Sequence, residues 1–225
     1  MTSLIQTTNT YSLKTPAMIE IDLIHNARLG NLDAFNRLVL QYQDQVYRQA
    51  HWMLGDPLAA DDICQETFLR AFQKLHSFRD GSFRGWLLRI AQRLCLDELR
   101  RRKRRQALPL ELPDAEGNEY SLADWQIEQS ETPEELAEGS ITLHLIHQSL
   151  EQLSPEYRSV ITLVDVQGFD YAQTAEVLAI PLGTVKSRLA RARFQLRQVL
   201  LASGALADYL PEKNETPTSF KYGFS

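Results

Sequence analysis

A strip of arginines on one side of a predicted helix, residues 83–105, is the feature of this sequence best suited to chemistry. At about 100° per residue, Arg89, Arg93 and Arg100 fall within a strip about 40° wide, with Trp86 at its edge. The opposite half carries the apolar residues Leu87, Ile90, Ala91, Leu94, Cys95 and Leu99. Guanidinium groups fork onto phosphates and an indole stacks on an unstacked base, so the strip predicts a surface for melted nucleic acid. An amphipathic core helix with a solvated charged face explains the same pattern.

A second basic helix is predicted over residues 183–200, after a short helix and a glycine-containing turn. One face carries Val185, Leu189, Ala192, Leu196 and Val199, and the opposite face carries Thr184, Ser187, Arg188, Arg191 and Gln195. This succession is typical of a helix-turn-helix, whose second helix enters the major groove of DNA. There Lys186 and Arg191 reach guanine acceptors or phosphates, and Ser187 reaches a base edge. A basic helical hairpin that binds no DNA is the alternative.

A mixed acidic and apolar edge runs along a third predicted helix, residues 57–76. Asp62, Gln65, Glu66 and Leu69 recur there at three- and four-residue intervals. This edge suits docking onto a basic helix of a partner protein. Acidic residues early in a helix also stabilise its dipole, so a solvated face is the alternative interpretation.

The charge of the chain is distributed unevenly. The formal net charge is −5, which argues against a protein that coats nucleic acid indiscriminately. Residues 79–105 nevertheless carry ten basic side chains against three acidic ones, whereas residues 106–140 carry ten acidic and no basic side chains. Prolines and a glycine break the acidic stretch, which indicates a linker. Its charge either keeps the chain soluble or mimics a nucleic-acid strand inside a basic channel.

Helical periodicity and capping signals account for the rest of the chain, and no strand pattern occurs. Before the basic helix, apolar spacing predicts helices over about 21–30, 33–54 and 57–76, the last opened by Asp56 and Pro57. After the linker, capping signals at Thr132, Ser154 and Asp170 predict helices over 132–153, 155–166 and 171–179.

We therefore expect an all-α fold with two small helical domains joined by an acidic linker. The predicted parts are a flexible arm over 1–20, a first domain over 21–105, the linker over 106–131, a helix-turn-helix domain over 132–201 and a tail over 202–225. The tail is expected to be disordered, or else to dock through its aromatic residues.

The cysteines, the histidines and the hydropathy of the sequence limit the classes of function that we expect. Cys64 and Cys95 are the only cysteines and lie at apolar helix positions, which indicates buried thiols in a reducing compartment. No secretory or membrane-spanning segment is recognisable, so we expect a cytoplasmic protein without membrane insertion. His144 and His147 lack further ligands nearby, so no metal site is expected. No catalytic constellation or phosphate loop is recognisable, and no enzyme activity or cofactor is expected.

Three motifs together carry a resemblance to a known family. DDICQETFLRAF, SFRGWLLRIAQRLCLDELRRRKR and SPEYRSVITLVDVQGFDYAQTAEVLAIPLGTVKSRLARAR occur in this order, the first two separated from the third by the acidic linker. Over residues 33–200 the chain resembles the extracytoplasmic-function sigma factors of bacteria. The resemblance implies a subunit that joins core RNA polymerase through its largest subunits, reads the minus-ten and minus-thirty-five elements of promoter DNA, and promotes DNA melting. It also implies an inhibitory anti-sigma partner.

The resemblance assigns residues to three surfaces. The core-polymerase surface corresponds to Asp61, Asp62, Gln65, Glu66, Phe68, Leu69 and Ala71. The minus-ten surface corresponds to Phe78, Arg79, Phe83, Arg84, Trp86, Arg89, Arg93 and Arg100. The minus-thirty-five surface corresponds to Thr184, Lys186, Ser187, Arg188, Ala190 and Arg191. Many family members have Asn where this chain has Arg93, so the base preference at the minus-ten element is open.

Two functions of other kinds compete with this reading. A free-standing helix-turn-helix repressor or activator would bind duplex DNA tightly by itself, whereas a sigma factor needs polymerase to position both domains. An RNA-binding regulator would use the same basic strip. The acidic edge paired with the basic strip favours the sigma factor, because a simple repressor has no need of it.

Overall fold

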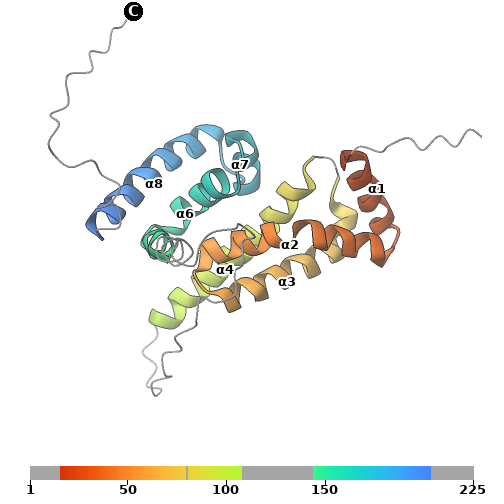
Figure 1. Cartoon of the computed structure of the whole chain (residues 1–225), viewed down its shortest axis with the longest axis horizontal. Helices are drawn as coiled ribbons and strands as arrows, with labels where there is room; N and C mark the ends of the chain where they lie inside the picture. The colour runs from red at the N-terminus through yellow and green to blue at the C-terminus, as the bar shows by residue number, and fades with distance from the viewer. Residues whose placement is uncertain (1–15, 80, 108–143, 204–225) are drawn as a thin grey trace, which may run out of the picture.

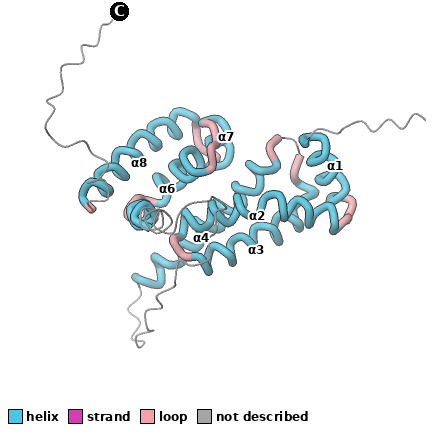
Figure 2. The backbone as a smooth tube through the Cα atoms, in the orientation of Figure 1, coloured by secondary structure: helices cyan, strands magenta, loops and turns pink. Residues whose placement is uncertain are grey.

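The computed structural model describes residues 16–79, 81–107 and 144–203. All regular structure in these residues is helical, as Figure 2 shows, and the predicted all-α class is confirmed. The first group comprises α1 (Pro16–Arg28), α2 (Leu32–Leu54), α3 (Pro57–Lys74), the 3-10 turn η1 (Leu75–Ser77) and α4 (Phe83–Ala107). The second group comprises a helix over 144–151, α6 (Pro155–Ile161), the π-helix η2 (Thr162–Val166), α7 (Tyr171–Leu178) and α8 (Leu182–Ala202).

The helices begin where the sequence offers capping groups. Asp56 accepts a hydrogen bond from Ala59 N ahead of Pro57, and the Ser154 hydroxyl accepts one from Tyr157 N. Asp170 forms the predicted capping box at the start of α7. The predicted helix start at Thr132, most of the arm, the linker and the tail lie outside the described residues.

The predicted helix over 155–166 changes its winding along the way. Residues Thr162–Val166 form a π-helix, in which Gln167 N donates to Thr162 O. Single π-turns of this kind are often found at functional positions. Directly after this turn, Gln167 and Phe169 are buried against α4. The change of winding therefore lies where the second group of helices meets the first.

The two groups of helices pack against each other. Figure 1 shows α7 beside α4, with α1, α2 and α3 on one side and α8 on the other. Leu163, Phe169 and Val177 belong to the same buried cluster as the core residues of α1 to α4. A second cluster joins Leu150, Leu153, Val160, Ile161, Leu189 and Ala192, with Trp52 of α2 packed on it. The two groups therefore share apolar contacts as well as having cores of their own.

The contact between the two groups of helices also explains why α2 ends at a glycine. Gly55 ends α2 with a φ of 69°, a left-handed conformation that glycine adopts without strain. A Cβ atom at this position would lie 1.6 Å from Glu151 Oε1 of the second group, so a larger residue would have to displace that side chain.

The two thiols differ in exposure, although both were expected to be buried. Cys95 is fully buried, as predicted, but Cys64 is only half-buried.

Among the described residues, no helix is both long and apolar enough to cross a bilayer.

Both thiols should react slowly with Ellman's reagent in the folded protein. Burial raises the pKa of Cys64 to about 11 and that of Cys95 to about 12, from an ordinary 9.0. Because the thiolate is the nucleophile, a pKa higher by about two lowers the rate at pH 8 about 100-fold. The release of thionitrobenzoate should be fast only in denaturant. Rapid release of one equivalent from the native protein would contradict this for Cys64.

Candidate nucleic-acid interface

Aromatic residues fix the loop in front of α4. Phe78 and Phe83 are buried, and their rings lie 5.3 Å apart, centroid to centroid. The Trp86 ring lies 5.4 Å from Phe78 and 5.6 Å from Phe83. The resemblance placed Phe78 and Phe83 on the minus-ten surface, but in this structure they are core residues that hold the loop in position.

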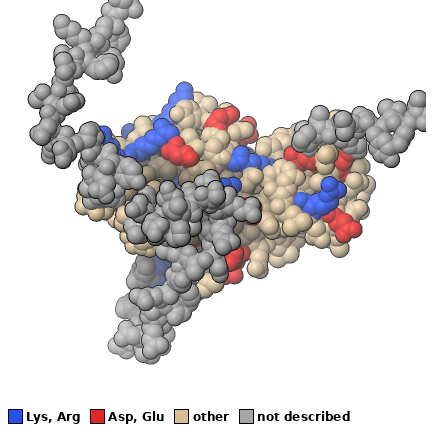
Figure 3. All heavy atoms as spheres, in the orientation of Figure 1, with Lys and Arg blue, Asp and Glu red and all other residues tan. Residues whose placement is uncertain are grey.

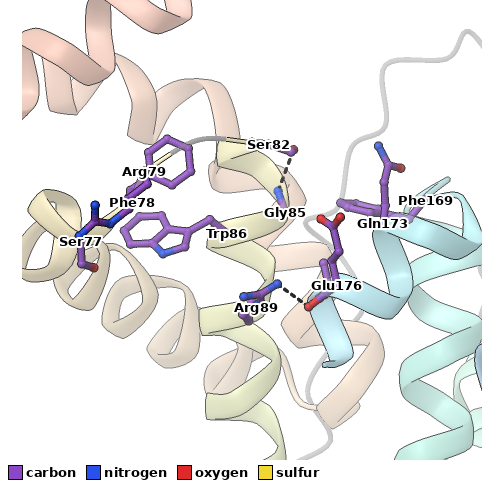
Figure 4. A pocket seen from close by; sticks show the side chains of 12 residues that line it. Ser77, Phe78, Arg79, Ser82, Gly85, Trp86, Arg89, Phe169, Gln173 and Glu176 are labelled. Atoms are coloured by element: carbon purple, nitrogen blue, oxygen red, sulfur yellow. Dashed lines mark hydrogen bonds between the residues drawn. The ribbon is translucent and has the colours of Figure 1, made fainter. Parts of the chain in front are cut away.

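A cavity of about 140 Å³ lies between this loop, α4 and α7. Figure 4 shows Arg79, Trp86 and Arg89 on one side of the cavity and Phe169 and Glu176 on the other. Trp86 is only partly buried, so part of its indole borders this space. The cavity brings an aromatic face together with two cations, and the second group of helices forms its other wall.

The four arginines of α4 that the resemblance placed on the minus-ten surface are divided between protein contacts and solvent. Arg84 donates to Gln167 O and lies 4.2 Å over the Phe169 ring, and burial lowers its pKa. Arg89 donates to Glu176 O at the end of α7 (Figure 4). The other two arginines, Arg93 and Arg100, are exposed, and Arg100 pairs with Asp97 at 3.1 Å. Arg84 and Arg89 therefore bind protein where the sequence predicted contact with nucleic acid.

The helix-turn-helix has the predicted two-faced second helix. Val185, Leu189 and Ala192 of α8 are buried. The opposite side presents Lys186, Ser187, Ala190 and Arg191, all exposed, and Thr184 and Arg188, both half-buried. Figure 3 shows basic side chains gathered over the upper stretch of α8. The predicted minus-thirty-five residues thus lie together on one accessible face.

The acidic edge of α3 is also accessible, with two exceptions. Asp61, Asp62, Gln65 and Leu69 are exposed, and Glu66 is half-buried. Phe68 is 8% exposed and Ala71 is 0% exposed, so both belong to the core and cannot meet a partner in this structure. Glu66 accepts a hydrogen bond from Arg70 Nε at 2.6 Å, which leaves Asp62 as the better placed carboxylate.

Sequence reasoning missed two apolar members of this surface. Leu58 is 59% exposed and Phe72 is 40% exposed. With Asp62, Gln65 and Leu69 they recur at steps of three or four residues, which places all five on one stripe of α3. We call Leu58, Asp62, Gln65, Leu69 and Phe72 the α3 stripe. Their spacing was visible in the sequence, but their exposure was not.

Sequence reasoning also missed the polar residues between the two groups of helices. Gln92 is buried in α4, where it accepts from Gln49 and donates to Ser159 Oγ. Arg158 is buried as well and donates to Met53 O of α2. No spacing rule marks these residues, because each pairs with a residue far away in the chain.

Two family models match the chain, one for each group of helices. The model described as sigma-70 region 2 matches residues 38–105, which include most of α2, all of α3 and most of α4. The model described as sigma-70, region 4 matches residues 143–196, which include α6, α7 and most of α8. The matches confirm the two predicted helical domains.

Curated relatives with a similar sequence are also sigma factors. The ECF RNA polymerase sigma factor SigW of Bacillus subtilis is 34% identical over 178 residues, covering 79% of this chain and 94% of the relative. The RNA polymerase sigma-H factor of Pseudomonas aeruginosa is 33% identical, covering 79% and 92%. The ECF RNA polymerase sigma factor SigE of Mycolicibacterium smegmatis is 36% identical, covering 75% of this chain but 62% of the relative.

Solved structures with a similar fold include two proteins in complexes. CnrH, solved in complex with the cytosolic domain of CnrY, has a TM-score of 0.58 and 26% identity, covering 82% of this chain and 98% of that one. The sigma factor RpoE of Bartonella quintana, solved with the anti-sigma factor NepR, has a TM-score of 0.55 and 25% identity, covering 74% and 96%. With regions 2 and 4 in the family's order, two helical domains to match them and relatives above 30% identity, the chain belongs to the ECF sigma factors of the sigma-70 family.

Proposed function

We propose that this sigma factor directs core RNA polymerase to its promoters through three separate surfaces. α8 reads the minus-thirty-five element, α4 and the loop before it read the minus-ten element and promote melting, and α3 docks on polymerase. The observation that carries the proposal is the pairing of a region 2 domain with a region 4 domain whose α8 keeps Lys186, Ser187 and Arg191 exposed on one face.

The face of α8 suits the major groove of DNA. Arg191 offers the forked donors that pair with guanine O6 and N7, and Lys186 offers a point charge for phosphate. Ser187 offers a short hydroxyl for a base edge, although in this structure it donates to Thr184 O within the helix. Ala190 leaves room for close approach and for contact with a thymine methyl group.

The α3 stripe suits a protein partner with a basic face. Three large apolar residues in line with a carboxylate and an amide form a docking surface, since soluble proteins rarely leave such side chains aligned in water. We infer that this stripe meets a basic helix of the largest polymerase subunit.

Further features follow from the family. We propose that the chain acts in the cytoplasm, without catalytic residues or a cofactor of its own, because it supplies recognition to the catalytic machinery of polymerase. An anti-sigma factor is the proposed inhibitor, and the RpoE complex with NepR supports this assignment.

Run-off transcription tests the function as a whole. Core polymerase, this chain and a fragmented genomic library should give new transcripts whose start sites share a minus-ten and a minus-thirty-five element. A chain that gives no transcripts but binds particular duplexes tightly without polymerase would be a repressor or activator instead.

Arg191→Ala should weaken recognition of the upstream element. A good bidentate contact to guanine discriminates by about 1–3 kcal/mol, so run-off from the chain's own promoters should fall about 5- to 150-fold. Arg197→Ala, at another exposed position of α8, is the matched control and should leave transcription unchanged. Measuring both variants on promoters with and without the upstream element identifies the contact. An equal loss on every template would mean that Arg191 touches only phosphate.

A further inference from the structure

An open groove lies beside the DNA face of α8. It has a volume of about 340 Å³ and is lined by Tyr157 of α6 and by Ala190, Arg191, Phe194 and Gln195 of α8. Phe194 is 65% exposed, more than any other aromatic side chain in the part of the chain that the structure describes. Arg191 is exposed as well and has no hydrogen bond or ion pair with another described residue. We call this space the α8 groove; it offers an uncovered aromatic ring next to a cation.

The chain continues beyond α8 from a point close to this groove. Ser203 is the C-cap of α8, and we call residues 204–225 the C-terminal segment. Phe194 lies nine residues before Ser203, which is about 14 Å along a helix that rises about 1.5 Å per residue. The stretch from Gly204 to Tyr209 spans up to about 17 Å when extended, at about 3.3 Å per residue. Glycine is common where a helix ends and the chain reverses, so a reversal at Gly204 brings Tyr209 level with Phe194.

The first part of the C-terminal segment has side chains that suit the α8 groove. Residues 204–212 read GALADYLPE and contain Tyr209 and Leu210, with two acidic residues and no basic one. Tyrosine can bury its ring against an apolar surface while its hydroxyl stays in water. Asp208 directly precedes Tyr209 and has the charge opposite to that of Arg191, the cation beside the groove. Apolar contact and charge therefore match at the same place.

Attachment to the same chain favours this occupant over a separate partner. A segment joined to its binding site by a few residues is present there at an effective concentration of about 1 mM. A groove that binds a tyrosine and a leucine only weakly is therefore still occupied in most molecules. A separate protein would have to bind far more tightly to displace the segment at cellular concentrations.

We propose that the C-terminal segment folds back along α8 and places Tyr209 and Leu210 in the α8 groove, with Asp208 beside Arg191. The bound segment competes with DNA, because the guanidinium of Arg191 cannot pair with a carboxylate and with a base at the same time. It therefore lowers the affinity of the free chain for duplex DNA. The consequence for promoter recognition rests on the proposed function, whereas the binding of the segment to the groove does not.

Paramagnetic relaxation in the full-length chain tests where the segment binds. A nitroxide on Glu212→Cys, in a Cys64→Ser background, should broaden the amide signals of residues 190–195. Phe194→Ser, a change at an exposed position, should reduce this broadening at least fivefold, and so should Tyr209→Ser combined with Leu210→Ser. These variants separate binding from the mere nearness of an attached segment.

A matched control lies further along the same segment. Phe220→Ser combined with Tyr222→Ser also removes two large side chains and should leave the broadening unchanged. Broadening that persists in both the groove variant and the Tyr209 and Leu210 variant, or that is lost only in this control, overturns the proposal.

Mixed samples distinguish the chain's own segment from that of a second copy. Spin-labelled chain without isotope labels is mixed with isotope-labelled chain that carries no nitroxide. The signals of residues 190–195 should stay sharp in the mixture. Broadening there would mean that the segment binds a second copy, and would overturn the fold-back along the same α8.

Release of the segment should raise the affinity of the free chain for duplex DNA. The apparent affinity of a site is reduced by the fraction of molecules in the competent state, so a groove empty in one molecule in ten lowers it about tenfold. The Tyr209→Ser and Leu210→Ser double variant, which adds no charge, should therefore bind a random-sequence duplex of about 20 base pairs about tenfold more tightly than wild type. Fluorescence anisotropy measures this, and the Phe220 and Tyr222 control should match wild type.

The outcomes separate this proposal from the proposed function. Equal affinity of all three chains for the duplex overturns the competition with DNA. Run-off transcription by wild type, measured alongside, tests the sigma function independently. Absence of transcripts from a chain that still shows the relaxation contacts would overturn that function and leave the binding of the segment intact.

Discussion

Core RNA polymerase should bind the Asp62→Arg variant at least about 100-fold more weakly than it binds the wild-type chain. Asp62 is exposed in the middle of the α3 stripe, between Leu58 and Leu69. Truncating one member of a close interfacial charge pair costs about 2–5 kcal/mol, and reversal adds repulsion to that loss. Glu66 is the weaker choice for this test, because its carboxylate is already paired with Arg70. Affinity is measured by surface plasmon resonance or by co-purification with core polymerase.

The fold of the Asp62→Arg variant should be intact, because exposed substitutions change stability by only about 0.5 kcal/mol. Asp97→Arg is the matched control, since it makes the same charge change at an exposed position of α4, outside the α3 stripe. The control should bind polymerase like the wild type. If Asp62→Arg co-purifies with polymerase as well as this control does, the α3 stripe is not the docking surface.

Local signals in the sequence predicted the helices and their faces. The caps at Asp56, Ser154 and Asp170 have side chains whose short reach to the next backbone amides decides where a helix begins. Burial of Val185 and Leu189 followed from their spacing alone, because α8 has one apolar side to pack. These features depend on residues within a few positions of one another, which is why a single sequence was enough.

The surroundings of the arginines of α4 depend on contacts that no local pattern contains. Arg84 meets Gln167 and Arg89 meets Glu176, partners more than 80 positions away. A helical wheel assigns Arg89 to solvent because it cannot include a second domain lying over α4, and it places Arg84 among the apolar positions without showing what that guanidinium contacts. Gln92 interrupts an apolar face for the same reason, since its partner Ser159 also belongs to that domain. The sequence therefore predicted which residues are basic and aligned, but not that protein covers them.

Arg158→Ala should lower the free energy of unfolding by about 3–5 kcal/mol, the largest stability loss we expect from one substitution in this chain. Arg158 is buried and donates to Leu150 O at 3.0 Å, Glu151 O at 2.7 Å and Met53 O at 2.5 Å. Two of these carbonyls end the helix over 144–151, where the negative end of the helix dipole favours a cation. Alanine removes the side-chain donor from Met53 O and Glu151 O, whereas Leu150 O keeps its bond from Leu153 N. Water that enters the space left by the side chain restores part of the loss, so the effect is smaller than the sum of the bonds.

Urea unfolding measures this loss, with Arg158→Lys and Arg197→Ala as comparisons. Lysine keeps the charge but not the planar fork that reaches several carbonyls, so its loss should fall between those of wild type and alanine. Arg197 is exposed on α8, and its removal should change the midpoint little. A loss below about 1 kcal/mol for Arg158→Ala would mean that the buried hydrogen bonds contribute little.

The number of transitions in the urea unfolding curve tests a second expectation for Arg158. Met53 belongs to α2, so Arg158 binds the end of a helix in its own domain and a carbonyl of the other domain at the same time. While Arg158 makes these hydrogen bonds, the two domains should unfold in one transition, because unfolding of either domain exposes the apolar contacts shared by both. In the Arg158→Ala variant, the second domain should unfold first, at a lower urea concentration, and the first domain should keep its own midpoint. A single transition in the Arg158→Ala variant, shifted as a whole, would show that the apolar contacts couple the domains without the arginine.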